Sequence, residues 1–158
     1  MADPYGHMMC VGDFSGDKKL VLKALNLFNW NTDYEPFRLD GDHFFVDGLV
    51  QFPSIFPSKK VVYDDNSDEV DPQHPAYNGE LPEDWYVESV EGGELDEIVK
   101  TIGPLLGSGE ITISMNSTFK SISMASGNLT IRSDLTATRR YMVSSSDGSK
   151  RDDTENYP

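Results

Sequence analysis

Acidic side chains are concentrated in one segment of the chain. Thirteen of the 27 Asp and Glu residues lie between positions 64 and 97, and no Lys or Arg lies among them. The rest of the chain holds fourteen acids and 13 bases, so the formal net charge of -14 comes almost entirely from this segment. Carboxylates at this density suit three roles: solvating a loop, attracting a basic surface, or binding a hard cation.

Calcium coordination fits the segment poorly. Asp64, Asn66 and Asp68 occupy alternate positions, as at the start of a calcium-binding loop. The sixth position is Glu69, where such a loop needs Gly for its turn, and the twelfth is Pro75, where it needs a bidentate Glu. We therefore predict no metal site here.

Aromatic residues lie among these acids and favour a binding role. DNA presents about one negative charge per 1.7 Å of duplex axis, and a folded array of carboxylates can imitate such a surface. Tyr and Trp side chains can anchor Arg side chains of a partner. The predicted partner-binding residues lie in the second half of the segment: Glu80, Glu83, Asp84, Trp85, Tyr86, Glu88, Glu91, Glu94, Asp96 and Glu97.

These features predict a non-enzymatic acidic interaction protein that binds a basic partner protein. Its sharper form is an inhibitor, or nucleic-acid mimic, that blocks a nucleic-acid-binding complex. Small acidic inhibitors of the phage or mobile-element anti-defence type are similar in charge and size, although no motif is shared. Direct binding of nucleic acid is not expected, because the 13 bases are scattered. The other reading is a solvated loop that only maintains solubility.

An apolar strand suggests a second class of function. Phe52, Ile55 and Phe56 lie in a repeated Phe-Pro-Ser pattern, and they form an exposed apolar patch unless the first helix covers them. If they are uncovered, the chain is a structural or assembly subunit that forms an oligomer through its sheet and this strand. In that case the acidic segment serves solubility alone.

A weaker alternative is a small metal-dependent hydrolase. Asp40, Asp42, His43 and Asp47 are close in sequence and could supply a general base and metal ligands. Asp-Gly turns explain two of these carboxylates without any metal.

Other catalytic patterns are missing from the sequence. Cys10 lies in an apolar run, which is typical of a buried, inert thiol, and no serine lies in a Gly-x-Ser-x-Gly pattern. The three His residues lack the close spacing of a zinc motif. We therefore predict no enzyme and no cofactor. One Cys, no leader pattern and no membrane-length apolar stretch predict a soluble protein of the reducing cytoplasm.

Two segments have the apolar spacing of amphipathic helices. The first covers residues 17–30, with Ser15 or Asp17 as its N-cap, and the second is expected to end or kink at Gly103 and Pro104. The apolar positions are Leu20, Val21, Ala24, Leu25 and Phe28 in the first, and Leu95, Ile98, Val99 and Ile102 in the second.

Strands are predicted on both sides of each helix. Apolar runs indicate strands at residues 8–11, 59–63 and 85–90, and Asp-Gly pairs at 40–41 and 47–48 predict hairpins. From Glu110 onward, apolar residues alternate with Ser and Thr, which predicts an antiparallel meander with a turn at residues 125–128.

The order of elements predicts an α+β fold. We expect antiparallel sheet, in one piece or two, with two helices packed on one face and a strand-helix-hairpin plan in each half. A long acidic loop, residues 64–82, would lie exposed between the halves. Residues 1–143 are expected to form a single domain, and residues 144–158 a disordered polar tail.

Overall fold

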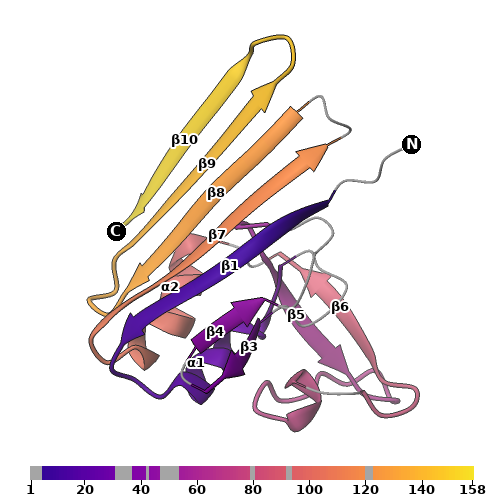
Figure 1. The fold of residues 1–158 in the computed structure, drawn as a ribbon. Coiled ribbons are helices and arrows are strands. Elements are labelled where there is room, and N and C mark those ends of the chain that lie inside the picture. The colour runs from indigo at the N-terminus through magenta and orange to yellow at the C-terminus, as the bar shows by residue number, and fades with distance from the viewer. Residues whose placement is uncertain are drawn as a thin grey trace.

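The computed structural model describes residues 5–30, 37–41, 43–46, 54–78, 81–91, 94–119 and 123–158. It confirms the α+β class, since antiparallel sheet is combined with two short helices (Figure 1). The largest sheet has the order β1-β7-β8-β9-β10, with all neighbours antiparallel. Its strands are β1 (Tyr5–Phe14), β7 (Gly109–Phe119), β8 (Ser123–Arg132), β9 (Ala137–Ser145) and β10 (Lys150–Tyr157).

Two smaller sheets complete the described strands. One has the order β2-β5-β6 and the other is the hairpin β3-β4, which forms around the predicted Asp40–Gly41 turn. Their bounds are β2 (Phe28–Asn29), β3 (Phe37–Asp40), β4 (His43–Val46), β5 (Ser58–Tyr63) and β6 (Tyr86–Val90). The second predicted hairpin, at residues 47–48, lies outside the described residues.

The five-stranded sheet has one apolar face and one polar face, as the alternating pattern predicts. Ile111, Ile113 and Leu129 are fully buried on the first face. On the second face, Thr112 and Thr130 share a hydrogen bond of 3.0 Å across β7 and β8. The core of the protein therefore lies on one side of this sheet.

Both helices contribute to that core. They are α1 (Lys18–Leu25) and α2 (Leu95–Ile102), and both lie near one end of the five-stranded sheet (Figure 1). Asp17 is the N-cap of α1, because its side chain accepts a 2.9 Å hydrogen bond from the backbone N–H of Lys19. The α2 helix ends at Ile102 and continues as the short 3-10 turn η2 (Gly103–Leu105), as the Gly-Pro pair predicts.

The first helix is shorter than the sequence pattern predicts. It ends at Leu25 instead of continuing to residue 30, and Phe28 already belongs to β2. The indole Nε1 of Trp30 donates a 2.9 Å hydrogen bond to the carbonyl of Leu25, which satisfies an acceptor at the helix end. Phe28 and Trp30 are buried and pack edge to face, so their apolar character reflects core packing beyond the helix.

The N-terminal and C-terminal halves share one sheet. Strand β1 pairs with β7 along ten residue pairs, from Tyr5 opposite Thr118 to Phe14 opposite Gly109. The strand-helix-hairpin plan does not determine whether the two halves form one sheet or two, and this pairing joins them in one.

The predicted turn at residues 125–128 is wrong, because these residues lie inside β8. Gly127 is a strand residue opposite Met115 on one side and Tyr141 on the other. The described turns lie elsewhere. In the turn between β8 and β9, Asp134 accepts hydrogen bonds from the N–H and hydroxyl of Thr136, which hold the pKa of Asp134 below its ordinary value.

The structure also differs from the predicted disordered tail. Strand β9 runs to Ser145, and after a turn at Asp147 the chain returns as β10 along eight residue pairs. Strand β10 has few apolar residues, and charged contacts attach it to β9. Arg139 pairs with Glu155 at 2.6 Å, and Arg140 pairs with Asp152 at 2.7 Å.

The acidic segment is not an exposed loop throughout. Asp64 closes a turn by accepting hydrogen bonds from the N–H groups of Asn66 and Asp68, at 2.9 and 3.0 Å. After this turn Val70 and Tyr77 are buried, the latter within the 3-10 turn η1 (Pro75–Asn78). The segment therefore folds back onto β5 with its apolar residues inside and its acidic side chains outside.

No helix in the described ranges is long and apolar enough to span a membrane.

Candidate functional site

Strand β6 forms an edge of the three-stranded sheet and lies at the centre of the predicted binding region. It pairs with β5 on one side, and among the described residues no strand pairs with its other side. Four of its five residues are exposed, and the exposed fraction is 39% for Tyr86 and 41% for Val87. A strand with this composition and exposure offers both backbone and side chains to a partner.

The hydrogen bonds of β5 determine which backbone groups of β6 face outward. Val62 donates its N–H to the hydroxyl of Tyr77 at 3.1 Å and accepts from the N–H of Val70 at 2.9 Å, so its backbone faces away from β6. Its cross-strand partner, Val87, therefore directs its own N–H and C=O away from β5.

Ser89, two residues further along β6, has the same backbone orientation as Val87. The N–H of Lys60 bonds to the carbonyl of Leu27 at 3.1 Å and so faces away from β6. Its partner Ser89 then directs its backbone polar groups to the free edge. Val87 and Ser89 together present two donors and two acceptors along this edge.

Two tyrosines form an aromatic surface beside this edge. The rings of Tyr63 and Tyr86 stack across β5 and β6 with centroids 5.1 Å apart and planes inclined by 23°. The pKa of Tyr63 is raised, first by partial burial of its phenol and then by the carboxylate of Glu88. Glu88 thus lies close enough to act on Tyr63, and a cation binding there would meet both a carboxylate and an aromatic face.

The opposite face of this small sheet is occupied by the chain itself. Val62, Val70 and Tyr77 form a buried cluster against which Leu81 and Trp85 pack. Trp85 also lies beside His74, with ring centroids 5.3 Å apart. The structure therefore gives Trp85, a predicted binding residue, a packing role.

Acidic side chains flank β6 at both ends. Glu83 and Asp84 are exposed in the turn before it, where Asp84 has a φ of 69° and Trp85 donates its N–H to the carbonyl of Pro82 at 3.2 Å. Glu91 is exposed directly after the strand. We call the surface made of Tyr63, Glu83, Asp84, Tyr86, Val87, Glu88, Ser89 and Glu91 the acidic edge.

The remaining predicted acids belong to α2. Glu94 is its N-cap, with no side-chain hydrogen bond to the helix, and Asp96 and Glu97 lie in its first turn. Asp96 lies 3.8 Å from the ammonium of Lys100, and within the described ranges this is the only ion pair made by an acid of residues 64–97. These three residues sit on a different element from the acidic edge. Glu80 lies outside the described residues.

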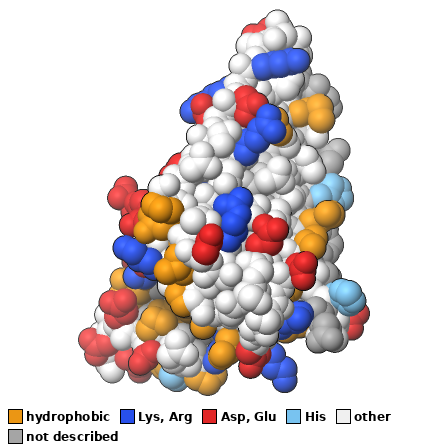
Figure 2. Space-filling model, turned by 90° about the vertical axis from the view of Figure 1, so that its left-hand side faces the viewer, with side chains coloured by type: hydrophobic (Ala, Val, Ile, Leu, Met, Phe, Trp, Pro, Cys, Tyr) orange, Lys and Arg blue, Asp and Glu red, His pale blue; other side chains and the backbone are white. Residues whose placement is uncertain are grey.

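The side of the molecule formed by β10 has a different charge pattern. There, Lys and Arg side chains are interspersed with Asp and Glu side chains (Figure 2). The pairs of Arg139 with Glu155 and of Arg140 with Asp152 belong to this edge of the large sheet. Charge compensation on β10 contrasts with its absence at the described acids of the acidic edge.

The predicted apolar patch is covered at Ile55 but 43% exposed at Phe56, and the contacts of both residues are with the five-stranded sheet instead of the first helix. Ile55 is fully buried, with its Cδ1 atom close to the backbone of Gly127 in β8. Phe56 packs edge to face on Tyr141 at 5.3 Å, and the guanidinium of Arg139 lies 4.4 Å from its ring centre. Phe52, the third predicted residue, lies outside the described residues.

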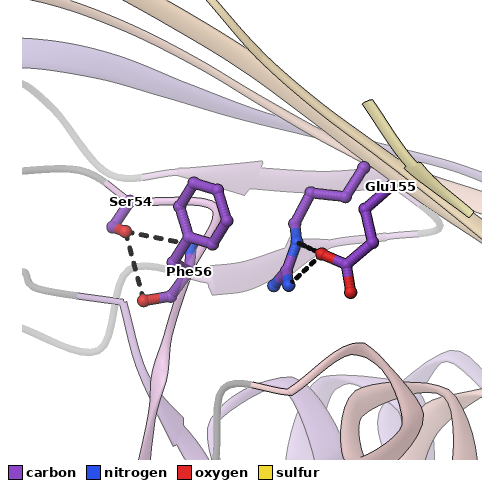
Figure 3. Close-up of polar contacts among 4 residues, drawn as sticks. Ser54, Phe56 and Glu155 are labelled. Carbon is purple, nitrogen blue, oxygen red and sulfur yellow. Dashed lines mark hydrogen bonds and ion pairs between the residues drawn. The ribbon is translucent and has the colours of Figure 1, made fainter. Parts of the chain in front are cut away.

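A buried arginine that no sequence motif indicated connects this segment to β10. The guanidinium of Arg139 donates two hydrogen bonds to one oxygen of Glu155, at 3.2 and 2.6 Å (Figure 3). The hydroxyl of Ser54 meanwhile accepts from the N–H of Phe56 at 3.0 Å, which shapes the loop under Arg139 (Figure 3). These contacts attach residues 54–56 and β10 to the buried guanidinium of Arg139.

Three of the candidate catalytic residues, Cys10, Asp40 and His43, lie in the described part of the chain. Burial raises the pKa of the Cys10 thiol to about 12, so it is protonated and inert at neutral pH. Asp40 and His43 are opposite each other in the β3-β4 hairpin and are exposed, whereas Asp42 and Asp47 lie outside the described residues. No group of three metal-ligating side chains was found in the part of the chain that the structure describes.

A hollow that the sequence does not predict lies on the half of the large sheet away from the helices. Its volume is about 600 Å³, and all five strands contribute to its lining. Met124 and Met142 are part of the lining, together with small polar side chains such as Ser126 and the charged residues Lys150, Arg151 and Asp152 of β10. Only the register of the five strands brings these residues together.

Comparison with known proteins gives no relative of this chain: no family model, no curated protein and no solved structure matches it.

Proposed function

We propose that this chain is a non-enzymatic interaction protein that binds a basic surface of a partner protein through the acidic edge. One observation supports this most directly. Glu83, Asp84, Glu88 and Glu91 are exposed along and beside an edge strand whose outer side pairs with no described strand, and none of them forms an ion pair with a described residue.

Uncompensated carboxylates on a rigid strand suit a charged partner. Their mutual repulsion falls when basic side chains of the partner come between them, and the field extends over a Debye length of about 8 Å at physiological ionic strength. The attraction raises the association rate and weakens as salt is added. Strand β6 holds Glu88, and the turn before it and the residue after it place the other three charges at its two ends.

A sharper form of the proposal is competition with nucleic acid. An inhibitor that occupies the phosphate-binding groove of a nucleic-acid-handling complex needs ordered negative charge and aromatic anchors, and the acidic edge offers both. Small acidic inhibitors of the phage or mobile-element anti-defence type are similar to this chain in charge and size, and this chain is proposed to act as such an inhibitor. This form of the proposal is supported by the exposed carboxylates that the fold places along the acidic edge.

Charge reversal tests the proposal. A variant with Glu83, Asp84, Glu88 and Glu91 changed to Lys should capture no partner from lysate of the native host, whereas the parent chain should. A control variant with Asp13, Asp65, Asp68 and Glu69 changed to Lys has the same net charge and an intact acidic edge, and it should retain the partner. Unchanged capture by the first variant at low salt would reject the proposal.

Oligomer assembly through the large sheet is the second candidate. Assembly through the Phe52 to Phe56 strand has less support, because Ile55 is fully buried and the 43% exposed Phe56 packs on Tyr141. Met9, Val11 and Met124, however, are each more than 60% exposed on the polar face of the sheet. Sedimentation across a salt series distinguishes the candidates, since a salt-insensitive oligomer favours assembly and a monomer at all salt concentrations contradicts it.

A further inference from the structure

We propose that the acidic edge binds an extended basic segment of the partner as an added β-strand next to β6. This inference rests on the proposed function and specifies its mode: backbone pairing at Val87 and Ser89 supplies affinity, and the flanking carboxylates select a cationic sequence.

A comparison of the sheet edges at β6 and β10 supports strand addition at β6. Natural proteins protect exposed edges with charged side chains, Lys, Pro or bulges. Strand β10, with the sequence KRDDTENY, has this protection, and its charges pair with β9 and with each other. Strand β6, with the sequence YVESV, has no Lys, Pro or bulge, and its one charged residue, Glu88, forms no ion pair with a described residue. Its Tyr and Val residues favour strands. Strand β6 therefore has less of this protection than β10 has.

The outward backbone groups define how a neighbour would pair. Val87 and Ser89 are two residues apart, so their N–H and C=O groups form the repeat of an antiparallel or parallel ladder. An added strand of about five residues would satisfy all four groups. Between Asp84 and Glu91 there is room for roughly seven residues at about 3.3 Å each.

The side chains define the sequence of the added strand. On one face of the sheet, Glu88 lies between Tyr86 and Val90, so a Lys or Arg opposite Glu88 would meet its carboxylate and could also cover the Tyr63–Tyr86 pair. On the other face, Val87 and Ser89 favour small or apolar neighbours. The occupant is therefore a segment in which basic and apolar residues alternate.

A synthetic peptide tests this directly. A seven-residue peptide in which Lys and Arg alternate with Val, labelled for fluorescence anisotropy, should bind the full chain, and the affinity should fall with salt. Two further versions carry N-methyl groups on either the basic residues or the Val residues. In an added strand one set of N–H groups faces β6 and the other faces solvent. One version should therefore bind at least tenfold more weakly while the other binds as the parent peptide does.

A pair of proline variants provides the matched protein control. Val87→Pro removes an N–H that faces the free edge, so β6 should remain paired with β5 while peptide affinity falls at least tenfold. Glu88→Pro removes an N–H that faces β5 and should destabilise the sheet itself. In the unmodified chain, the amide protons of Val87 and Ser89 should exchange more slowly once the peptide is bound.

The outcomes separate this inference from the proposed function. Equal affinity of the two N-methylated peptides, or unchanged exchange at Val87 and Ser89 in the complex, would overturn strand addition. If charge reversal still abolished partner capture in that case, the acidic interaction would stand without it. If the charge-reversed chain bound both peptide and partner as the parent does, both proposals would fail.

Discussion

Gly127 in β8 lies directly against Ile55: a Cβ atom added to Gly127 would lie 2.6 Å from Cδ1 of Ile55 and 3.1 Å from the carbonyl oxygen of Arg140. Ile55 is fully buried, so its side chain has little room to move. A glycine is therefore needed at this position for residues 54–57 to approach the large sheet closely, and this contact packs them against it.

The first prediction concerns this contact. Gly127→Ala should lower the free energy of unfolding by about 1–3 kcal/mol, as expected for overpacking of a filled core. In the background of Ile55→Val, which removes the Cδ1 atom, the same change should cost less. Urea unfolding of the four chains gives the coupling energy, and strictly additive effects would contradict the proposed contact. Ser126→Ala, a neighbouring strand change, should alter stability by no more than about 0.5 kcal/mol.

The second prediction concerns the attachment of β10. Glu155→Gln should destabilise the protein by about 1–2 kcal/mol, because the guanidinium of Arg139 is buried and loses a charged acceptor. Amide exchange along β10 should quicken at the same time. Exchange rates that stay unchanged would show that the pair does not attach the strand.

Asp152→Asn is the matched control for that change. The Asp152–Arg140 pair is exposed, so its loss should matter less than that of Glu155. The hydrogen bond from Arg140 lowers the pKa of Asp152 from its ordinary 3.8. A lowered carboxyl pKa stabilises the fold above pH 3.8, and this contribution is lost as the pH falls through the folded-state value. The Asn variant should lack that part of the acid dependence.

The third prediction concerns the folded part of the acidic segment. The Tyr77 hydroxyl accepts from the N–H of Val62 and donates to the carbonyl of Val70 at 3.2 Å, and all three residues are buried. Tyr77→Phe should therefore cost about 1–3 kcal/mol of unfolding free energy, since two buried backbone groups lose their partner. Thermal unfolding measures the loss, and a change below about 0.5 kcal/mol would argue that the segment does not pack on β5.

The fourth prediction concerns the buried thiol. Because burial raises the pKa of Cys10 from 9.0 to about 12, the unfolded chain releases this proton at lower pH than the folded chain does. Stability should therefore fall as pH rises from 9 toward 12, by up to about 1.4 kcal/mol per pH unit. The Cys10→Ala variant should show a shallower slope in urea unfolding over this range, and the native thiol should react slowly with iodoacetamide at pH 8. Equal slopes would contradict the inference.

The fold was predictable wherever local periodicity and local contacts coincide. The apolar spacing of α2, the cap at Asp17 and the Asp40–Gly41 turn are all local signals, and each is confirmed. The misplaced turn has a nonlocal cause. Gly127 is a residue type that favours turns, but it lies in a strand between Met115 and Tyr141, and the close approach of Ile55, far away in sequence, accounts for the glycine.

The candidate site was predictable only as a region. A count of charges identifies residues 64–97, but the outward direction of Val87 and Ser89 follows from hydrogen bonds that β5 makes with Leu27, Val70 and Tyr77. Sheet order, which no short stretch encodes, decides that β6 is an edge. The attachment of β10 by Arg139 was unpredictable for the same reason, because composition alone makes the strand look disordered.

The pairing of β1 with β7 has a consequence for how the chain folds. The partner of Tyr5 is Thr118, so the first strand remains without its neighbour until most of the chain is available. Loop-closure entropy opposes such a contact until the intervening elements have condensed, which favours refolding on the slow side of the range for small domains, in milliseconds to seconds. During synthesis, the apolar residues Met8 and Cys10 would wait uncovered longer than any others in the sheet, and this interval is when the chain most needs protection from aggregation.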